Sequence, residues 1–384
     1  MKSLARPRII ASILTVIVLV VALGLLGGGW YYSNVLRDGG LLPDHSEPKL
    51  DMIVAGVADG RITLNPSEEA EKDGPWTENG LWGLELEGEY HGVGSIISIT
   101  ESAVVREFMP RGESPASGEL ARLDNYSFSD NPGSVTGIPF TEVSYSSPIG
   151  EFSAWMIDGT RNDWAIFVHG KGAERGEALR MLPVMVDMGY PSLVITYRND
   201  LGEPANQDGY YHFGQTEWVD LEGAVKYALD EGAKNVVLVG YSMGGAIVVN
   251  FLYESEISQS VEATILDAPM LDFNATIDLG ARERGAPGIL TAIGKMFTSL
   301  RFGIDLEAID YLKSVDELST PILLFHGDAD DIVPIETSET LAKARPDLVN
   351  FVRVPGAGHV RAWNLNPTQY EAEVREFMSS LSRR

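Results

Sequence analysis

Five short apolar segments alternate with helical patterns in the second half of this 384-residue chain. Each segment has the length of one strand and is rich in β-branched residues: 165–169, 192–197, 236–240, 264–267 and 322–326. Between them, residues 216–230 and 245–254 carry apolar side chains at helical spacing, and residues 141–145 and 152–157 read as paired strands. Because strands that alternate with helices form a sheet covered on both faces, the pattern predicts an α/β fold with a mainly parallel sheet.

The N-terminus contains an uncharged apolar stretch, residues 9–32, which follows Lys2, Arg6 and Arg8. A membrane span needs about 20 apolar residues, whereas the apolar centre of a signal peptide has roughly 7 to 15. We therefore predict one transmembrane helix that anchors the chain, with a cytoplasmic start and all later residues outside the cytoplasm. A signal peptide cleaved between residues 22 and 29 is the alternative, and it predicts a secreted protein. Both readings predict export.

The segment between the anchor and the α/β pattern is turn-rich at first and then contains strands. Residues 33–73 are polar and begin as a stalk. Candidate strands separated by turns follow within and after it: 61–64, 81–86, 93–100 and 103–108. The predicted parts are an anchor at residues 1–32, a stalk with a small β-rich module at 33–137, and an α/β domain at 138–384.

Composition excludes several classes of function. The formal net charge of -26 argues against a nucleic-acid partner, since a phosphate backbone would be repelled. The absence of cysteine excludes disulfides, cysteine nucleophiles and thiolate zinc sites. No phosphate-binding, dinucleotide or calcium motif is complete, so we expect neither a cofactor nor a metal ion.

The segment Gly240-Tyr241-Ser242-Met243-Gly244-Gly245 comes directly after a predicted strand and opens an apolar helix. A serine on such a sharp turn adopts a strained backbone conformation, and glycines are needed where strand and helix approach closely. The hydroxyl is then exposed above the sheet, beside the free N–H groups of the helix N-terminus. The context predicts that Ser242 is a nucleophile.

With this elbow, the sequence from about residue 141 to the C-terminus resembles the α/β-hydrolase family. Two later segments match the family in the correct order. Residues 326–334, which read HGDADDIVP, place Asp330 at the family's acid position, and residues 356–359, which read GAGH, place His359 at its base position. The resemblance implies an α/β-hydrolase fold with a Ser242–Asp330–His359 triad; Asp267, at the end of another strand, is the alternative acid.

The resemblance also implies two-step acyl transfer. His359 would take the Ser242 proton and return it to the leaving group, and Asp330 would orient the imidazole. The oxyanion needs two donors. Met243 supplies one backbone N–H, and the turn at residues 169–172, which resembles the family's oxyanion turn, assigns the second to Lys171.

Residues 272–318 form a long insertion after Asp267, where members of the family often carry a cap. Its apolar residues are equally consistent with ordinary core. The favoured function is a carboxylesterase that forms an acyl-Ser242 intermediate on a small-molecule or lipid-like ester. The alternatives are a lipase-like hydrolase of monoacylglycerols or lysolipids, a peptidase resembling prolyl oligopeptidases, and a non-catalytic binding protein on the same fold. The oligomeric state is open.

Overall fold

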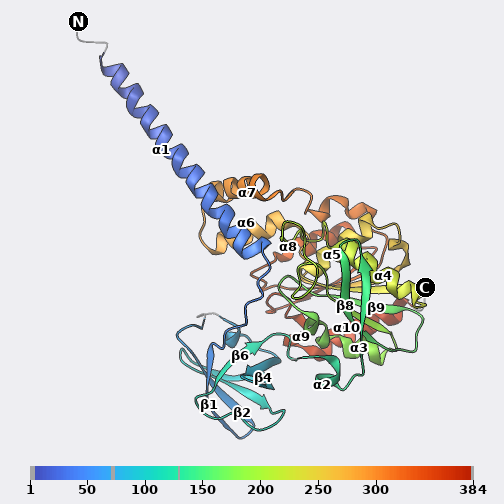
Figure 1. Ribbon diagram of the computed structural model, residues 1–384. Coiled ribbons are helices and arrows are strands. Elements are labelled where there is room, and N and C mark those ends of the chain that lie inside the picture. Colours follow the sequence, from blue (N-terminus) through green and yellow to red (C-terminus); the bar gives the residue numbers. More distant parts are fainter. Residues whose placement is uncertain (1–4, 71–73, 129, 382–384) are drawn as a thin grey trace.

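The computed structural model describes residues 5–70, 74–128 and 130–381, and Lys2 lies outside these ranges. A long N-terminal helix projects from the rest of the molecule, a small barrel lies at the other end, and an α/β domain joins the two (Figure 1). The helices are α1 (Ala5–Leu36), α2 (Pro132–Thr136), α3 (Leu182–Asp187), α4 (Trp218–Asp230), α5 (Met243–Glu254), α6 (Phe273–Glu283), α7 (Gly288–Phe302), α8 (Ile335–Ala344), α9 (Ala362–Leu365) and α10 (Pro367–Leu381). Short helical turns lie at η1 (Arg37–Leu41), η2 (Pro75–Thr77), η3 (Arg175–Arg180), η4 (Ser258–Ser260) and η5 (Tyr311–Glu317).

The strands form two separate sheets. The first is a closed barrel of β1 (Met52–Ala58), β2 (Arg61–Pro66), β3 (Trp82–Leu86), β4 (Glu89–Ile99), β5 (Val104–Met109) and β6 (Leu120–Asp124). The second is the sheet of the α/β domain, with β7 (Thr141–Ser147), β8 (Gly150–Ile157), β9 (Trp164–Val168), β10 (Ser192–Ile195), β11 (Val236–Tyr241), β12 (Val261–Asp267), β13 (Ile322–Gly327) and β14 (Val349–Val354).

The large sheet has the order β14-β13-β12-β11-β9-β10-β8-β7. The strands from β9 to β14 run parallel, and the hairpin β7–β8 pairs antiparallel at one edge. In the fully buried strand β11, Val236 and Leu238 pack with α4 and α5 on one face, while Val237 and Val239 pack with α3 and α10 on the other. The predicted α/β fold with helices on both faces is therefore confirmed.

The barrel confirms the predicted β-rich segment but contains two strands that the sequence pattern did not indicate. In β1 the pairing register shifts between Val54 and Gly56, which interrupts the apolar alternation that marks a strand. In β6 only five residues pair, and two of them are charged. The interior is filled by apolar side chains of all six strands and by Trp76 of η2. The segment predicted to begin as a stalk thus supplies β1 and β2.

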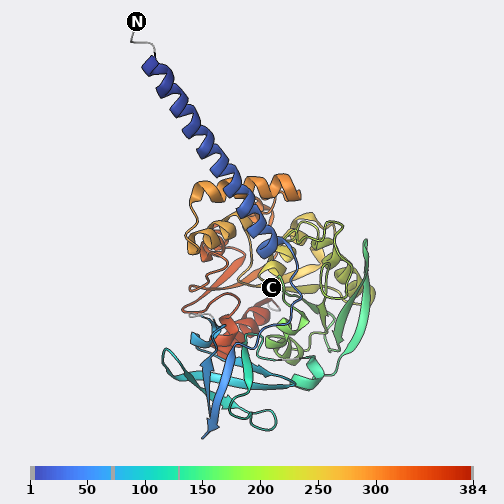
Figure 2. The same ribbon diagram turned by 60° about the vertical axis from the view of Figure 1, so that its left-hand side comes forward.

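Helix α1 extends beyond the predicted end at residue 32. Residues 10–41 are long and apolar enough to cross a membrane, and the helical part runs to Leu36 before the π-helical turn η1. Residues 10–24 are exposed, whereas the last turns of α1 cross α7 and reach the α/β domain (Figure 2). These last turns are therefore part of the folded protein rather than a stalk.

Candidate active site

Ser242 lies on the sharp turn between β11 and α5. Its backbone has φ 49° and ψ −114°, a strained conformation that non-glycine residues rarely adopt. The neighbouring glycines are required by close approach: a Cβ at Gly240 would lie 2.7 Å from the carbonyl oxygen of Gly244, and a Cβ at Gly244 would collide with the carbonyl of Val168. The local sequence therefore forces the Ser242 hydroxyl out above the sheet.

Two loops from neighbouring parallel strands bring the other predicted residues to this serine. His359 follows β14, and its Nε2 lies 2.8 Å from the Ser242 Oγ. Asp330 follows β13, and its Oδ2 lies 2.7 Å from the Nδ1 of His359. Because Nδ1 faces a carboxylate, it carries the proton that Asp330 accepts, which leaves Nε2 free to accept the serine hydroxyl proton. The structure thus joins Ser242, His359 and Asp330 in one hydrogen-bonded chain.

Asp330 is held in its ionised form by its surroundings. Burial alone would raise the pKa of its carboxyl, but the charge of His359 and hydrogen bonds from His326 and His359 outweigh burial and hold the pKa well below 3.8. The backbone N–H groups of Ile332 and Val333 donate to Oδ1 at 2.9 and 2.8 Å. The carboxylate is therefore fixed in position and in charge.

The two predicted oxyanion donors come from different segments, the start of α5 and the loop after β9. Met243 is the first residue of α5, where the N–H has no acceptor within the helix. Gly170 approaches the serine so closely that an added Cβ would lie 3.2 Å from the Ser242 Cβ, and its own N–H donates to Glu177 at 2.7 Å. The N–H of Gly170 is therefore occupied, and Lys171 is the next residue of this loop.

A buried polar cluster, which the sequence did not reveal in detail, supports the loop of Gly170. The ring of His169 stacks on Tyr197 with centroids 4.4 Å apart, and its nitrogens lie 2.9 Å from the Gly170 carbonyl and from Asp200. Burial lowers the pKa of His169, but the Asp200 carboxylate outweighs burial and leaves the pKa above its ordinary value. Both ring nitrogens face oxygen acceptors, and His169 thus braces the loop.

The barrel contacts the segment that follows His359. The side chain of Asn364 in α9 donates to the carbonyl oxygens of Leu81 and Asn125 at 2.8 and 2.7 Å, and its backbone carbonyl accepts from the N–H of Leu81 at 2.7 Å. Glu78 pairs with Arg361. Between His359 and α9 the backbone is strained, with φ 53° at Val360. The barrel thus holds the segment that carries this strain.

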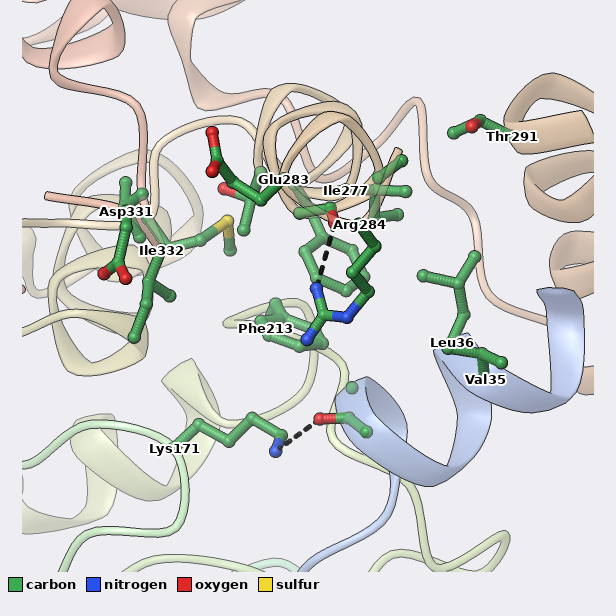
Figure 3. A pocket seen from close by; sticks show the side chains of 18 of the residues that line it. Val35, Leu36, Lys171, Phe213, Ile277, Glu283, Arg284, Thr291, Asp331 and Ile332 are labelled. Atoms are coloured by element: carbon green, nitrogen blue, oxygen red, sulfur yellow. Dashed lines mark hydrogen bonds between the residues drawn. The ribbon is translucent and has the colours of Figure 1, made fainter. Parts of the chain in front are cut away.

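A cavity of about 720 Å³ opens above Ser242 and His359. Its far wall consists of the end of α1 with η1 (residues 32–40), α6 and α7, and we call these three elements the cover. Val35 and Leu36 of α1 face Ile277 of α6 and Arg284, the residue after α6, across the cavity (Figure 3). The Nζ of Lys171 donates to the Gly39 carbonyl at 3.1 Å. The wall that α1 contributes was missed, because nothing in its sequence distinguishes it from a membrane span.

Other candidate groups lie apart from this chain of hydrogen bonds. Asp267 is buried below the site, and its Oδ1 has no hydrogen-bond partner in the described part of the chain. The Nδ1 of His326 lies 2.7 Å from the Ser338 Oγ, but both side chains are fully buried and neither lines the cavity. Ser338 cannot meet a substrate there, so this pair braces the acid loop. Residues 5–70, 74–128 and 130–381 contain no group of three or more His, Asp or Glu side chains arranged to hold a metal ion.

Comparison with known sequences gives one family and several distant relatives. The model of the prolyl oligopeptidase family matches residues 179–382, just over half of the chain, including Ser242, Asp330 and His359. The protein YqkD of Bacillus subtilis is 23% identical, over 56% of this chain and 71% of its own length. A pimeloyl-[acyl-carrier protein] methyl ester esterase of Vibrio atlanticus is 23% identical, over 38% of this chain and 71% of its own length.

Comparison with solved structures gives the esterase Pf2001 of Pyrococcus furiosus. The match has a TM-score of 0.54 and 22% identity, and it covers 65% of this chain and 94% of that protein. At this identity the match establishes a shared fold, and it takes in nearly all of the esterase. The part of the chain that has no counterpart is about the size of the anchor and barrel together.

Proposed function

Because this chain belongs to the prolyl oligopeptidase family and has an α/β-hydrolase fold, we propose that it is a serine hydrolase that cleaves carboxyl esters. The observation that carries the proposal is the continuous hydrogen-bonded chain from the Ser242 Oγ through His359 to Asp330, at 2.8 and 2.7 Å. A lone serine hydroxyl is a weak nucleophile, and this arrangement is the one that activates it.

In the proposed reaction, Nε2 of His359 takes the Ser242 proton while Oγ attacks the ester carbonyl carbon. The negative charge that develops on the carbonyl oxygen is stabilised by the N–H groups of Met243 and Lys171, each worth about 10²- to 10³-fold in rate. His359 then protonates the departing alcohol, which leaves an acyl-Ser242 ester. A water molecule, deprotonated by His359, attacks this ester; the C–O bond to Ser242 breaks, His359 returns the proton to the Ser242 Oγ, and the acid is released.

The lining of the cavity favours an ester with an apolar acyl group over a peptide. Six buried residues of the lining are apolar: Met243, Met270, Phe213, Phe273, Ile277 and Val333. Two of its charged side chains already have partners, since Lys171 donates to the Gly39 carbonyl and Arg284 donates to the Gly280 carbonyl at 3.0 Å. A peptide would leave backbone groups without partners in such a lining.

A peptidase is the second candidate, and the family match is the observation that favours it. Esters and amides share the same acyl-enzyme, so the triad geometry does not separate them. Parallel turnover of an apolar nitrophenyl ester and of the nitroanilide with the same acyl group does. We expect the ratio of kcat/KM for the ester to kcat/KM for the amide to exceed the ratio of their uncatalysed hydrolysis rates.

We assign α1 as a retained anchor rather than a cleaved signal. Its last turns pack closely on α7: a Cβ at Gly28 would lie 2.7 Å from Leu290, and a Cβ at Gly29 would collide with Ile293. Arg301 of α7 also binds Ser33 and Asn34 of α1, at 2.5 and 2.9 Å. Cleavage between residues 22 and 29 would remove part of this contact. The charges before residue 9 then favour a cytoplasmic N-terminus and a catalytic domain outside the cytoplasm.

In this proposal residues 1–32 anchor the chain, residues 33–137 contain the barrel, and residues 138–384 form the catalytic domain with a cap at 272–318. Labelling with a fluorophosphonate probe tests the central claim. The wild type should be labelled and Ser242→Ala should not, with both proteins unfolding at the same temperature. Folded wild-type protein that resists labelling would instead indicate a binding protein on a hydrolase fold.

A further inference from the structure

Helix α7 carries a stripe of large apolar side chains that no other part of the described chain covers. Ile289, Met296 and Leu300 are 60%, 50% and 76% exposed. They are spaced by seven and four residues, so they lie on one face of the helix, and the exposed Ala292 lies between them. A contiguous exposed apolar row, unlike single exposed residues, indicates a surface that meets another apolar phase.

The other faces of α7 are occupied. Leu290, Ile293 and Phe297 face α1, where the Phe297 ring meets Trp30 edge-on with centroids 6.4 Å apart. Thr291 and Thr298 are buried. At 100° per residue, these threonines lie opposite the exposed stripe. Ile289 and Leu300 therefore point away from the body of the protein, while Ala292 and Met296 also border a surface hollow lined by Asp305 and Glu307. Both views show α7 between the α/β domain and the free half of α1 (Figures 1 and 2).

The contact between α1 and α7 fixes where α7 lies relative to the apolar span. The uncharged residues 9–27 precede the contact, and at 1.5 Å per residue they rise about 29 Å, close to the thickness of a bilayer's hydrocarbon core. The contact begins at Gly28, and the exposed aromatic residues Trp30 and Tyr31 follow at once. Such rings are typical of the membrane–water interface. Helix α7 crosses α1 from Gly28, which lies against Leu290, to Asn34, which accepts a hydrogen bond from Arg301, so the start of α7 lies closest to this level.

The cavity above Ser242 begins directly below this level. Tyr32, Val35 and Leu36 of α1 line it, and so does Thr291 of α7. The same two helices therefore bound the interface on one side and the cavity on the other.

We propose that Ile289, Met296 and Leu300 insert into the interface of the bilayer that α1 crosses, and that the substrate is a single-chain amphiphilic ester taken from this bilayer. The substrate part deepens the proposed hydrolase function and rests on it. A volume of about 720 Å³ is within the range that holds one drug-sized ligand, which suits one acyl chain. A bilayer suits the stripe better than a second copy of the chain, because the stripe continues the exposed apolar surface of α1 and each copy carries a net charge of -26.

The membrane contact is tested by depth-dependent quenching. The chain has no cysteine, so Met296→Cys and Leu300→Cys each offer one labelling site for an environment-sensitive dye on the full-length protein. Leu120→Cys on the barrel strand β6, 51% exposed, is the matched control. In phosphatidylcholine vesicles, lipids with a shallow spin label should quench dyes 296 and 300 by at least about twofold and leave dye 120 unchanged.

Two results would overturn the membrane contact. If the dyes at positions 296 and 300 are quenched no more than the dye at position 120, the stripe lies in water. Dyes that shift to the blue without quenching by spin-labelled lipid place it against protein, which identifies a second copy of the chain as the occupant.

The substrate class is tested by kinetics of Leu300→Asp, with Leu120→Asp as the control. We expect Leu300→Asp to lower hydrolysis of a monoacyl ester embedded in phosphatidylcholine vesicles by about tenfold, and to change hydrolysis of soluble nitrophenyl butyrate by less than twofold. A wild type that cleaves the soluble ester but not the vesicle-borne ester refutes the substrate class and leaves the hydrolase proposal standing. A wild type that cleaves neither ester refutes both, while quenching still decides the membrane contact.

Discussion

At the carboxyl ends of the strands, Ser242, His359 and Asp330 are held by directed hydrogen bonds of 2.7 to 2.8 Å, whereas the cover above them is held mainly by apolar contact. The hydrogen bonds allow one arrangement, because each donor needs its acceptor at a set angle. Apolar contacts are not directional and tolerate changes of shape at similar volume.

This difference separates two properties of the site. Under the proposed function, the loops at the strand ends would determine which reaction is possible, while the cover would determine which acyl group fits. Changes in the first region should therefore alter the rate for all substrates equally, and changes in the second should alter the ratio between substrates.

The largest effect is expected from His359→Gln, which removes the base from the hydrogen-bonded chain. We expect kcat to fall by about 10⁵-fold or more for every ester, with KM within a few-fold of the wild type, because the cover still binds substrate. Steady-state kinetics on a short and a long nitrophenyl ester check this. A loss confined to one chain length would break the proposed separation.

The next largest effect on kcat is expected from a comparison of asparagine substitutions at two buried aspartates, Asp330 and Asp267. Asp330→Asn should lower kcat by about 10⁴-fold, since the amide no longer holds the productive imidazole tautomer. Asp267→Asn, at the end of the neighbouring strand β12, should leave kcat within about threefold because it makes no hydrogen bond to His359 in the structure. Equal losses in both variants would mean that Asp330 is not the acid of the site.

Replacement of Asp267 should change the free energy of unfolding rather than kcat. Burial is the largest cause that raises its pKa to about 6, from 3.8 in an exposed aspartate. Above pH 6 the folded protein holds a buried charge that the unfolded chain keeps in water, which costs up to about 3 kcal/mol. Asp267→Asn should therefore be more stable than the wild type at pH 7.5, and the difference should shrink as the pH falls from 6 toward 4. Urea unfolding at several pH values measures this, and a difference independent of pH would count against it.

The smallest effect is expected in the cover. Ile277→Trp on α6 adds volume to the wall of the cavity. We expect the ratio of kcat/KM for the butyrate to the dodecanoate nitrophenyl ester to rise by about tenfold, since chain-length discrimination in an apolar pocket is worth about 1–3 kcal/mol. The butyrate rate is the internal control. Equal loss on both esters would show that this wall does not select the chain.

The same contrast explains what could be predicted from the sequence. Ser242, Asp330 and His359 each follow a recognisable strand and lie in a turn with glycine or proline, so local pattern placed them on loops that a parallel sheet brings together. Two of the six barrel strands were not predicted, because a register shift in β1 and the short pairing of β6 obscure the alternating pattern of a strand. The contribution of α1 to the cavity had no local signal, since an apolar helix looks the same whether it faces lipid or protein.

The contact between Glu78 and Arg361 joins residues 283 positions apart, and no spacing rule reaches that far. Gly80 contacts the same C-terminal segment. Its φ of 120° and its closeness to Asn364, whose carbonyl oxygen would lie 2.5 Å from an added Cβ, show why glycine stands there. From sequence alone, that glycine is one of 40 and carries no mark of its partner.

The hydrogen bonds between the barrel and Asn364 bear on the stage of protein synthesis at which the site can be completed. Proteins are made from the N-terminus, and domains fold as they emerge from the ribosome. The barrel is therefore complete long before His359 and the segment that it holds have been synthesised. A nascent chain that already contains Ser242 still lacks its proposed base, so the proposed hydrolase activity would arise only when translation is nearly finished.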